Sequence, residues 1–166
     1  MTQRDGQRSA VYAAEQVVHG LLDRAATAPT LDIAGSRITL PPERRFADLR
    51  SVQDYVELVL DLDRVRGRWP GAGPVLVRER AGDRQAHYER ETATIAVPGV
   101  VRGSRWALRE LVLLHELAHH VTWTTGLAPH GPHFVGGYLE LVDVAIGPEA
   151  SFVLRVTMAE AGVRAA

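Results

Sequence analysis

An apolar stretch between Trp106 and Val121 restricts the fold of this chain more than any other feature. Its apolar residues recur at helical spacing but cover more than one side of the helix. They are Trp106, Leu108, Leu111, Val112, Leu114, Leu117, Ala118 and Val121. Such a helix must be buried, because it has no polar face to present to water. Ser104 is expected to cap this helix, and the other elements are expected to pack around it.

The same helix carries His115, Glu116 and His119 in the pattern H-E-x-x-H. Positions i and i+4 lie on one face, so both imidazoles can reach a single ion about 2 Å from each nitrogen. Glu116 lies about 100° further round the helix, which suits a water on that ion. Chance would produce the pattern somewhere in this composition with a probability of about 2%. We therefore predict a metal site with Glu116 as general base.

Composition narrows the choice of metal. The 166 residues include no cysteine, which excludes disulfides, thiolate ligands and a cysteine nucleophile. Three nitrogen or oxygen ligands and one water describe a catalytic zinc site, in which the pKa of the water falls to about 7. Zn²⁺ is thus the expected cofactor. A fourth protein ligand would instead indicate a non-catalytic, zinc-stabilised binding or regulatory module.

The third ligand is left open by the residues alone. The candidates downstream are His130, His133, Glu140 and Asp143. The metzincin pattern is excluded, because Thr122 and Thr125 occupy the places of its glycine and its last histidine. His120 is rotated about 100° from His119, so it is expected to be a hydrogen-bonded or surface histidine outside the ligand set.

Two segments of the chain resemble the SprT-like or Spartan-type zinc proteases, which belong to the zincins. They are HELAH, residues 115–119, and HGPHF, residues 130–134. The resemblance covers roughly residues 74–141 and extends to small bacterial metallohydrolases with a short strand before the helix. It implies a zincin-like fold, with Glu116 as the catalytic base. The ligands that it implies are His115, His119 and His130.

The chain also departs from that family and resembles others. The gap from His119 to His130 is shorter than in Spartan-type proteases, and no cysteine zinc ribbon or basic tail follows, so action on DNA-bound proteins is not expected. In related zincins a histidine can stand at the place of His133. Glu140 resembles the ligand of thermolysin-type and ImmA/IrrE-type zincins. If His130 is the ligand, Glu140 or Asp143 could orient an imidazole through its second nitrogen.

The remaining patterns predict an α+β fold with a single zincin-like domain over residues 1–166. A small antiparallel sheet of three to four strands is expected to pack on the active-site helix, with further N- and C-terminal helices. The expected parts are an N-terminal helical part at 9–66, a catalytic core at 74–147 and a C-terminal helix at 148–162. Within the first part we expect helices at 9–26 and from Ser51, as N-cap with Asp54 in a capping box, to Gly67.

Three segments are predicted to be strands. Residues 31–40 are expected to form one short strand or an extended segment, and residues 75–77 and 85–88 a hairpin. The strand at 92–97 is expected at the sheet edge, where an extended peptide could pair with it, which favours a peptide or protein substrate. Tyr88 and Tyr138 are possible oxyanion donors, although each could be a packing tyrosine with its hydroxyl at the surface.

The net charge of the chain does not indicate a charged binding partner. The 19 basic and 20 acidic residues leave a net charge of −1, so neither nucleic acid nor an anionic membrane is an expected partner. Seven arginines between Arg64 and Arg90 are expected to coat a solvated hairpin, and the alternative is a surface for nucleic acid or an anionic substrate. The N-terminus has no signal-peptide pattern and no run of 18 apolar residues occurs, so a cytoplasmic protein is expected.

Overall fold

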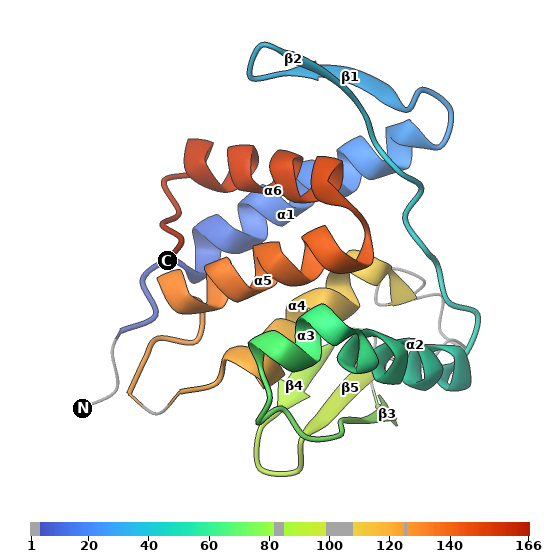
Figure 1. The fold of residues 1–166 in the computed structure, drawn as a ribbon, viewed down its shortest axis with the longest axis vertical. Helices are drawn as coiled ribbons and strands as arrows, with labels where there is room; N and C mark the ends of the chain where they lie inside the picture. The colour runs from blue at the N-terminus through green and yellow to red at the C-terminus, as the bar shows by residue number, and fades with distance from the viewer. Residues whose placement is uncertain (1–3, 82–84, 99–107, 125) are drawn as a thin grey trace. The chain divides into compact units, whose positions relative to one another are not determined.

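A computed structural model describes residues 4–81, 85–98, 108–124 and 126–166. Within these ranges the chain is α+β, with six helices, one two-stranded sheet and one three-stranded sheet (Figure 1). No helix in the described part is long and apolar enough to cross a membrane. The chain divides into two compact units. Met1–Glu43 and Trp123–Ala166 make up what we call the discontinuous unit, and Arg44–Thr122 the central unit.

Three helices form the body of the discontinuous unit. They are α1 (Arg8–Ala25), α5 (Pro132–Ala145) and α6 (Pro148–Glu160). Helix α6 contacts both α1 and α5, which Figure 1 shows in red, blue and orange. The helices predicted at 9–26 and 148–162 are observed within a few residues of those bounds. Gly147 has a φ of 142°, a conformation that lets the chain turn sharply between α5 and α6.

A hairpin replaces the single strand predicted at 31–40. Strands β1 (Thr30–Ile33) and β2 (Ser36–Thr39) pair antiparallel, with Ile33 opposite Ser36. The two residues between them, Ala34 and Gly35, have φ values of 48° and 76°. Positive φ at both central positions is typical of a type I′ turn, whose twist matches that of the strands. The prediction overlooked this turn because alanine is rare in such a position.

Substitutions at Ala34 and Gly35 would test the positive φ values of the hairpin turn. Ala34→Gly is expected to stabilise the hairpin by about 0.5–1 kcal/mol, because glycine adopts positive φ without the steric cost that alanine bears. Gly35→Ala should have the opposite effect for the same reason. Hydrogen exchange of the amides between Thr30 and Thr39 would measure both changes. Equal exchange in the two variants would contradict the assigned turn.

The central unit combines three helices with the three-stranded sheet. The helices are α2 (Leu49–Asp61), α3 (Asp63–Arg68) and α4 (Glu110–Thr122). The strands are β3 (Leu76–Arg80), β4 (His87–Glu89) and β5 (Thr94–Pro98). Helix α2 contacts β3, and α4 contacts β4. Every residue of α4 from Glu110 to Ala118 is buried, as the apolar pattern predicted; the predicted cap Ser104 lies outside the described residues.

The pairing of the sheet differs from the prediction. Its order is β3-β5-β4, with β3 parallel and β4 antiparallel to β5. The predicted hairpin and the antiparallel sheet are therefore wrong, and the strand predicted at the edge lies in the centre. All five residues of β5 are buried, whereas β3 is partly exposed along its length. An apolar strand with no exposed position is typical of the middle of a sheet, where both of its edges are paired.

The predicted start of α2, with Ser51 as N-cap, is wrong. The N-cap is Asp48, whose Oδ1 accepts a hydrogen bond from the backbone N–H of Ser51 at 2.8 Å. Ser51 is the return partner of this capping box, since its Oγ accepts from the Asp48 N–H at 3.3 Å. These hydrogen bonds lower the pKa of Asp48. The predicted single helix to Gly67 is divided at Leu62, which has an extended ψ of 131° between α2 and α3.

Candidate metal centre

The histidine pair lies on α4 in the central unit. The Nε2 atoms of His115 and His119 are 3.2 Å apart, and the ring planes are inclined by 71°. His115 is only 2% exposed, while His119 is partly exposed. The i, i+4 spacing on a buried helix therefore brings both side chains to one point, with His119 on the side that remains accessible.

The separation of the two nitrogens fits a zinc ion. Two ligands at about 2.0–2.1 Å in tetrahedral geometry place their nitrogens about 3.3 Å apart. Without an ion, the same separation would allow one N–H···N hydrogen bond, with the two rings in opposite tautomers. In both cases the nitrogens converge, so the rigid helix supplies two ligands whose positions need little adjustment.

Glu116 is held in the same buried turn of α4. Its exposed fraction is 5%. The helix places it about 100° round from His115, outside the face that carries the two imidazoles. The same buried helical turn thus supplies two nitrogen ligands and a carboxylate on an adjoining face.

The N-terminal end of α4 is anchored by a buried carboxylate. Glu110 is 0% exposed and accepts hydrogen bonds from Arg44 Nη1 at 2.5 Å, the Arg44 backbone N–H at 2.9 Å and Tyr55 Oη at 2.7 Å. The backbone is tied as well, since the Phe46 N–H donates to the Leu108 carbonyl at 3.0 Å. The hydrogen bond with Glu110, more than any other cause, raises the pKa of Arg44. These contacts fix the position at which α4 begins. They therefore also fix where His115 and His119 lie along the helix axis.

His130 lies in the discontinuous unit, in the turn before α5. It is 5% exposed, and its Nδ1 is 2.8 Å from Asp5 Oδ2. The His130 backbone N–H donates to Asp5 Oδ1 at 3.3 Å. The ring also packs near the rings of Tyr12 and Phe134, at centroid distances of 5.5 and 5.1 Å. The imidazole of His130 is therefore held on several sides within its own unit.

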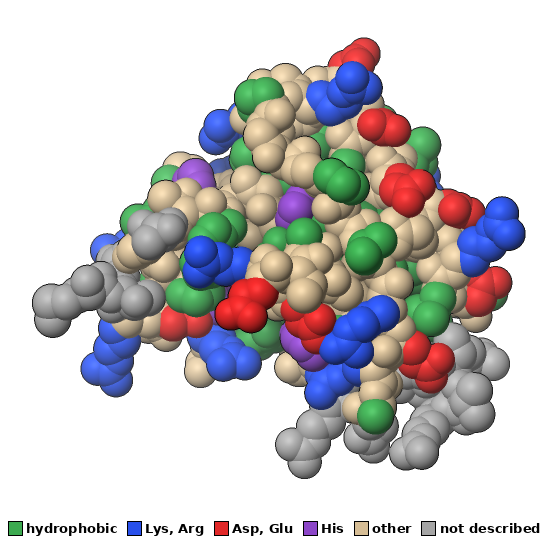
Figure 2. Space-filling view, turned by 90° about the horizontal axis from the view of Figure 1, so that it is seen from below, with side chains coloured by type: hydrophobic (Ala, Val, Ile, Leu, Met, Phe, Trp, Pro, Cys, Tyr) green, Lys and Arg blue, Asp and Glu red, His purple; other side chains and the backbone are tan. Residues whose placement is uncertain are grey.

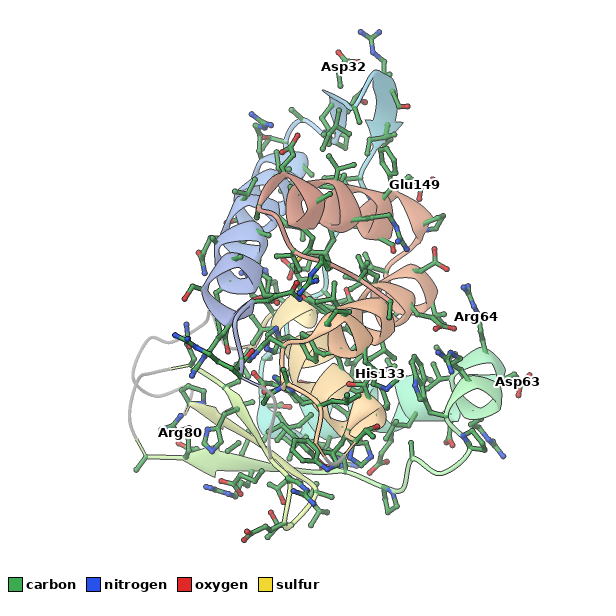
Figure 3. The ribbon with its side chains drawn as sticks, turned by 90° about the vertical axis from the view of Figure 1, so that its left-hand side faces the viewer. Asp32, Asp63, Arg64, Arg80, His133 and Glu149 are labelled. Atoms are coloured by element: carbon green, nitrogen blue, oxygen red, sulfur yellow. The ribbon has the colours of Figure 1, made fainter. Side chains whose placement is uncertain are left out.

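The other candidates for the third ligand belong to α5. His133 lies in the first turn of this helix, where Figure 3 labels it, and Glu140 and Asp143 follow two and three turns later. All three are partly exposed, in contrast to His130. Every candidate for the third ligand thus lies in the discontinuous unit, whereas the histidine pair lies in the central unit.

His120 has a defined place outside the pair. Its Nε2 is 2.9 Å from the Gly73 carbonyl, and its Nδ1 is 2.9 Å from Tyr88 Oη. Burial lowers the pKa of His120, and the bond to Gly73 opposes this effect only in part. The ring is therefore neutral with its proton on Nε2, because the carbonyl can only accept, and the Tyr88 hydroxyl donates to Nδ1. The hydrogen-bonded position expected for His120 is observed.

The two tyrosines considered as oxyanion donors differ from each other. Tyr88 is partly exposed on β4, and burial raises the pKa of its hydroxyl, which is engaged with His120. Tyr138 is 0% exposed on α5, with its ring 5.8 Å from that of Phe134. The expectation that a packing Tyr138 would keep its hydroxyl at the surface is wrong, since the whole side chain is buried.

A surface hollow lies in the central unit beside the residues that hold His120. Its volume is about 610 Å³. The lining combines apolar side chains with two acids and one arginine. The lining residues are Glu57, Leu60, Asp61, Val65, Arg66, Trp69, Pro70, Ala72, Gly73 and Pro74. Gly73 belongs both to this wall and to the hydrogen bond with His120, so the hollow adjoins α4 through that contact.

The arginine-rich span carries ion pairs with neighbouring acids. Arg78 pairs with Glu89 across the sheet, and Arg66 lies 3.9 Å from Asp61. Arg80, labelled in Figure 3, donates to the Gln85 carbonyl at 2.9 Å. Arg84 is outside the described residues. Figure 2 shows basic and acidic side chains interspersed on the face that it displays, as expected for a solvated surface of mixed charge.

Sequence reasoning missed the residues that hold His130. Asp5 and Gln7 are more than 120 positions away in the chain, and the Gln7 Nε2 donates to the His130 carbonyl at 3.1 Å. Neither residue belongs to a motif, so no local signal marks them. The one available hint was chemical, because a buried histidine that binds a metal needs a partner for its second nitrogen.

Comparison with protein-family models, with curated proteins and with solved structures gives no match. The resemblance to zincin-type proteases therefore depends on the motif residues alone.

Proposed function

We propose that this protein is a zinc-dependent hydrolase of zincin-like fold, and more narrowly a metallopeptidase that cleaves peptide or protein amide bonds. His115, His119 and His130 are the proposed ligands, and Glu116 is the proposed general base. One observation carries the proposal: two Nε2 atoms lie 3.2 Å apart on a buried helix, in which the residue after His115 is the buried Glu116. Two histidines and a glutamate in this relation match the donor set of a catalytic zinc site.

In this proposal each residue has a separate role in metal binding or proton transfer. Zinc, when bound, supplies a water with a pKa near 7 and polarises the substrate carbonyl. His115 and His119 hold the ion from a helix that is fixed at its start by Glu110, so their positions change little on binding. The Glu116 carboxylate accepts a proton from the attacking water and then delivers it to the leaving nitrogen.

The sheet supports a peptide substrate in a different way from the one predicted. Strand β5 is paired on both sides, so an extended substrate cannot add to it. Among the described strands of this sheet, β3 and β4 have outer edges, and β4 contacts α4. Pairing along an outer edge is a general way to hold an extended peptide. We therefore place the proposed peptide at β4.

Metal content tests the proposal directly. Purified wild-type protein is expected to bind one zinc per chain. Because each imidazole supplies a ligand bond, His115→Ala, His119→Ala and His130→Ala should each lower the zinc affinity by more than about 100-fold, beyond the usual effect of an outer partner. Competition with a chromophoric chelator would give the affinities. His87→Ala, in a histidine on β4 bonded to Arg80 and Glu89, is the matched control.

Two outcomes would count against the proposal. A wild-type chain that binds no zinc would remove its basis. An equal loss of affinity in His130→Ala and His133→Ala would mean that both imidazoles bind, which closes the fourth position and favours the zinc-stabilised binding or regulatory module.

A further inference from the structure

We propose that Asp5 is a positioning residue of the metal centre, which holds the His130 imidazole so that its Nε2 is presented to the ion. This inference depends on the proposed function, in which His130 is a ligand. It goes beyond that function because it makes the segment before α1 part of the site. Asp5 and His130 both belong to the discontinuous unit.

The Asp5 carboxylate contacts His130 at two atoms, one in the ring and one in the backbone. Its Oδ2 is 2.8 Å from the imidazole Nδ1, and its Oδ1 accepts the backbone N–H at 3.3 Å. The His130 side chain is 6% exposed and that of Asp5 is 25% exposed, so water competes little for the shorter contact. A carboxylate that binds both the ring and the main chain fixes the ring relative to the backbone that carries it.

The tautomer follows from the chemistry of the partner. An ionised carboxylate can only accept, so the proton of a neutral His130 ring is on Nδ1 and the lone pair is on Nε2. This is the tautomer that a metal needs for ligation through Nε2. A carboxylate on the far nitrogen also makes the imidazole a stronger base and hence a better ligand.

Asp5 is itself held in place by the residues that follow it. The Gly6 N–H donates to the Arg4 carbonyl at 2.9 Å, which makes a tight turn. Gln7 Nε2 donates to the carbonyls of His130 and Arg164, both at 3.1 Å, and Gln7 Oε1 accepts from the Arg164 N–H at 2.8 Å. Segment 5–7 therefore binds the N–H, the C=O and the ring of His130 at the same time.

Ring packing leaves the imidazole little freedom to turn. The Phe134 ring is in an edge-type contact with it, with ring planes inclined by 69°, and the Tyr12 ring is tilted by 54° to it. Rotation about the Cβ–Cγ bond would break the bond to Asp5 and disturb both ring contacts. A ligand already held in its binding orientation loses less conformational entropy when the ion arrives, which strengthens binding.

The competing explanation is that Asp5 only fastens the N-terminal segment to the turn before α5. A fastening role predicts that removal of Asp5 lowers stability without any special dependence on His130. A positioning role predicts a loss of zinc affinity that disappears when His130 is absent. A double-mutant cycle separates these two roles.

The experiment measures zinc affinity by chelator competition for wild type, Asp5→Ala, Asp5→Asn, His130→Ala and the double variant Asp5→Ala/His130→Ala. Asp5→Ala is expected to lower the affinity by about 10–100-fold. Asp5→Asn should show an intermediate loss, because its amide oxygen can still accept the Nδ1–H. In the His130→Ala background, the Asp5 substitution should change the affinity by less than about twofold.

The matched control is Asp32→Asn. Asp32 is an exposed aspartate of the same unit, paired with Arg37 at 3.0 Å in the hairpin and labelled in Figure 3. Its substitution should leave the zinc affinity unchanged. Thermal unfolding of the metal-free variants checks that each one is folded, and Asp5→Asn keeps the test valid if Asp5→Ala unfolds.

The possible results are distinguishable. Wild-type affinity in both Asp5 variants would overturn the role of Asp5 and leave the zinc site intact. An equal loss with and without His130 would also overturn it, in favour of the fastening role. If wild type binds no zinc, the proposed function and this inference fall together.

Discussion

Glu116→Gln is expected to lower the rate of hydrolysis by about 10²–10⁴-fold while the zinc content stays at the wild-type level. Glutamine has the shape of glutamate but cannot take a proton from the attacking water. The ligands are untouched, because Glu116 is rotated away from His115 and His119 on α4. Hydrolysis of casein and of a mixed peptide library, measured beside zinc per chain, would show the two effects separately.

The control for this variant is Glu79→Gln. Glu79 is an exposed glutamate on β3 of the same unit, so its loss removes the same charge without touching α4. It should retain full activity. If Glu116→Gln and Glu79→Gln hydrolyse these substrates at equal rates, Glu116 is not the base. Simultaneous loss of zinc and activity in Glu116→Gln would instead assign this carboxylate to the metal itself.

Glu110→Ala is expected to reduce the free energy of unfolding by about 2–4 kcal/mol, because it leaves buried hydrogen-bond donors without an acceptor. Three donors lose their acceptor, and one of them, the Tyr55 hydroxyl, belongs to a residue only 6% exposed. The Arg44 guanidinium can turn to water, since that side chain is 57% exposed, so most of the cost comes from the other two donors. Urea unfolding would measure the change.

Two companion variants sharpen this prediction. Tyr55→Phe removes one donor and leaves Glu110 with its bonds to Arg44, so it should cost only about 1 kcal/mol. Asp54→Ala breaks an exposed pair with Arg50 on α2, at 4.0 Å, and should change stability by less than about 0.5 kcal/mol. If all three variants unfold at the same urea concentration, Glu110 does not anchor α4.

Helical periodicity located the long helices but neither the break at Leu62 nor the pairing of the strands. Helix α1 shows its buried face through Val11, Ala14, Val18 and Leu22, because i, i+3 and i+4 contacts are local. The partner of a strand is chosen by packing far along the chain. Strand β3 pairs with β5 rather than with β4, the strand that follows it in the chain, so the local sequence did not predict this pairing.

In the candidate site too, local relations could be predicted from the sequence, whereas contacts between distant residues could not. His115, Glu116 and His119 were predictable because one helical turn fixes their relation. The partner of His130 was not, since Asp5 lies 125 positions earlier. His120 shows an intermediate case: its rotation from His119 indicated that it lies outside the pair, but its bonds to Tyr88 and Gly73 come from tertiary packing.

The division of the discontinuous unit between the two ends of the chain has a consequence for synthesis on the ribosome. Helix α1 is made early, but its packing partner α6 comes about 140 residues later. Synthesis proceeds at roughly 5–20 residues per second. The apolar face of α1 therefore lacks this packing partner for on the order of 10–30 s. The central unit is complete in sequence before α6 exists and can fold during this interval. We expect the nascent chain to need protection mainly at α1, from chaperones that bind exposed apolar helices.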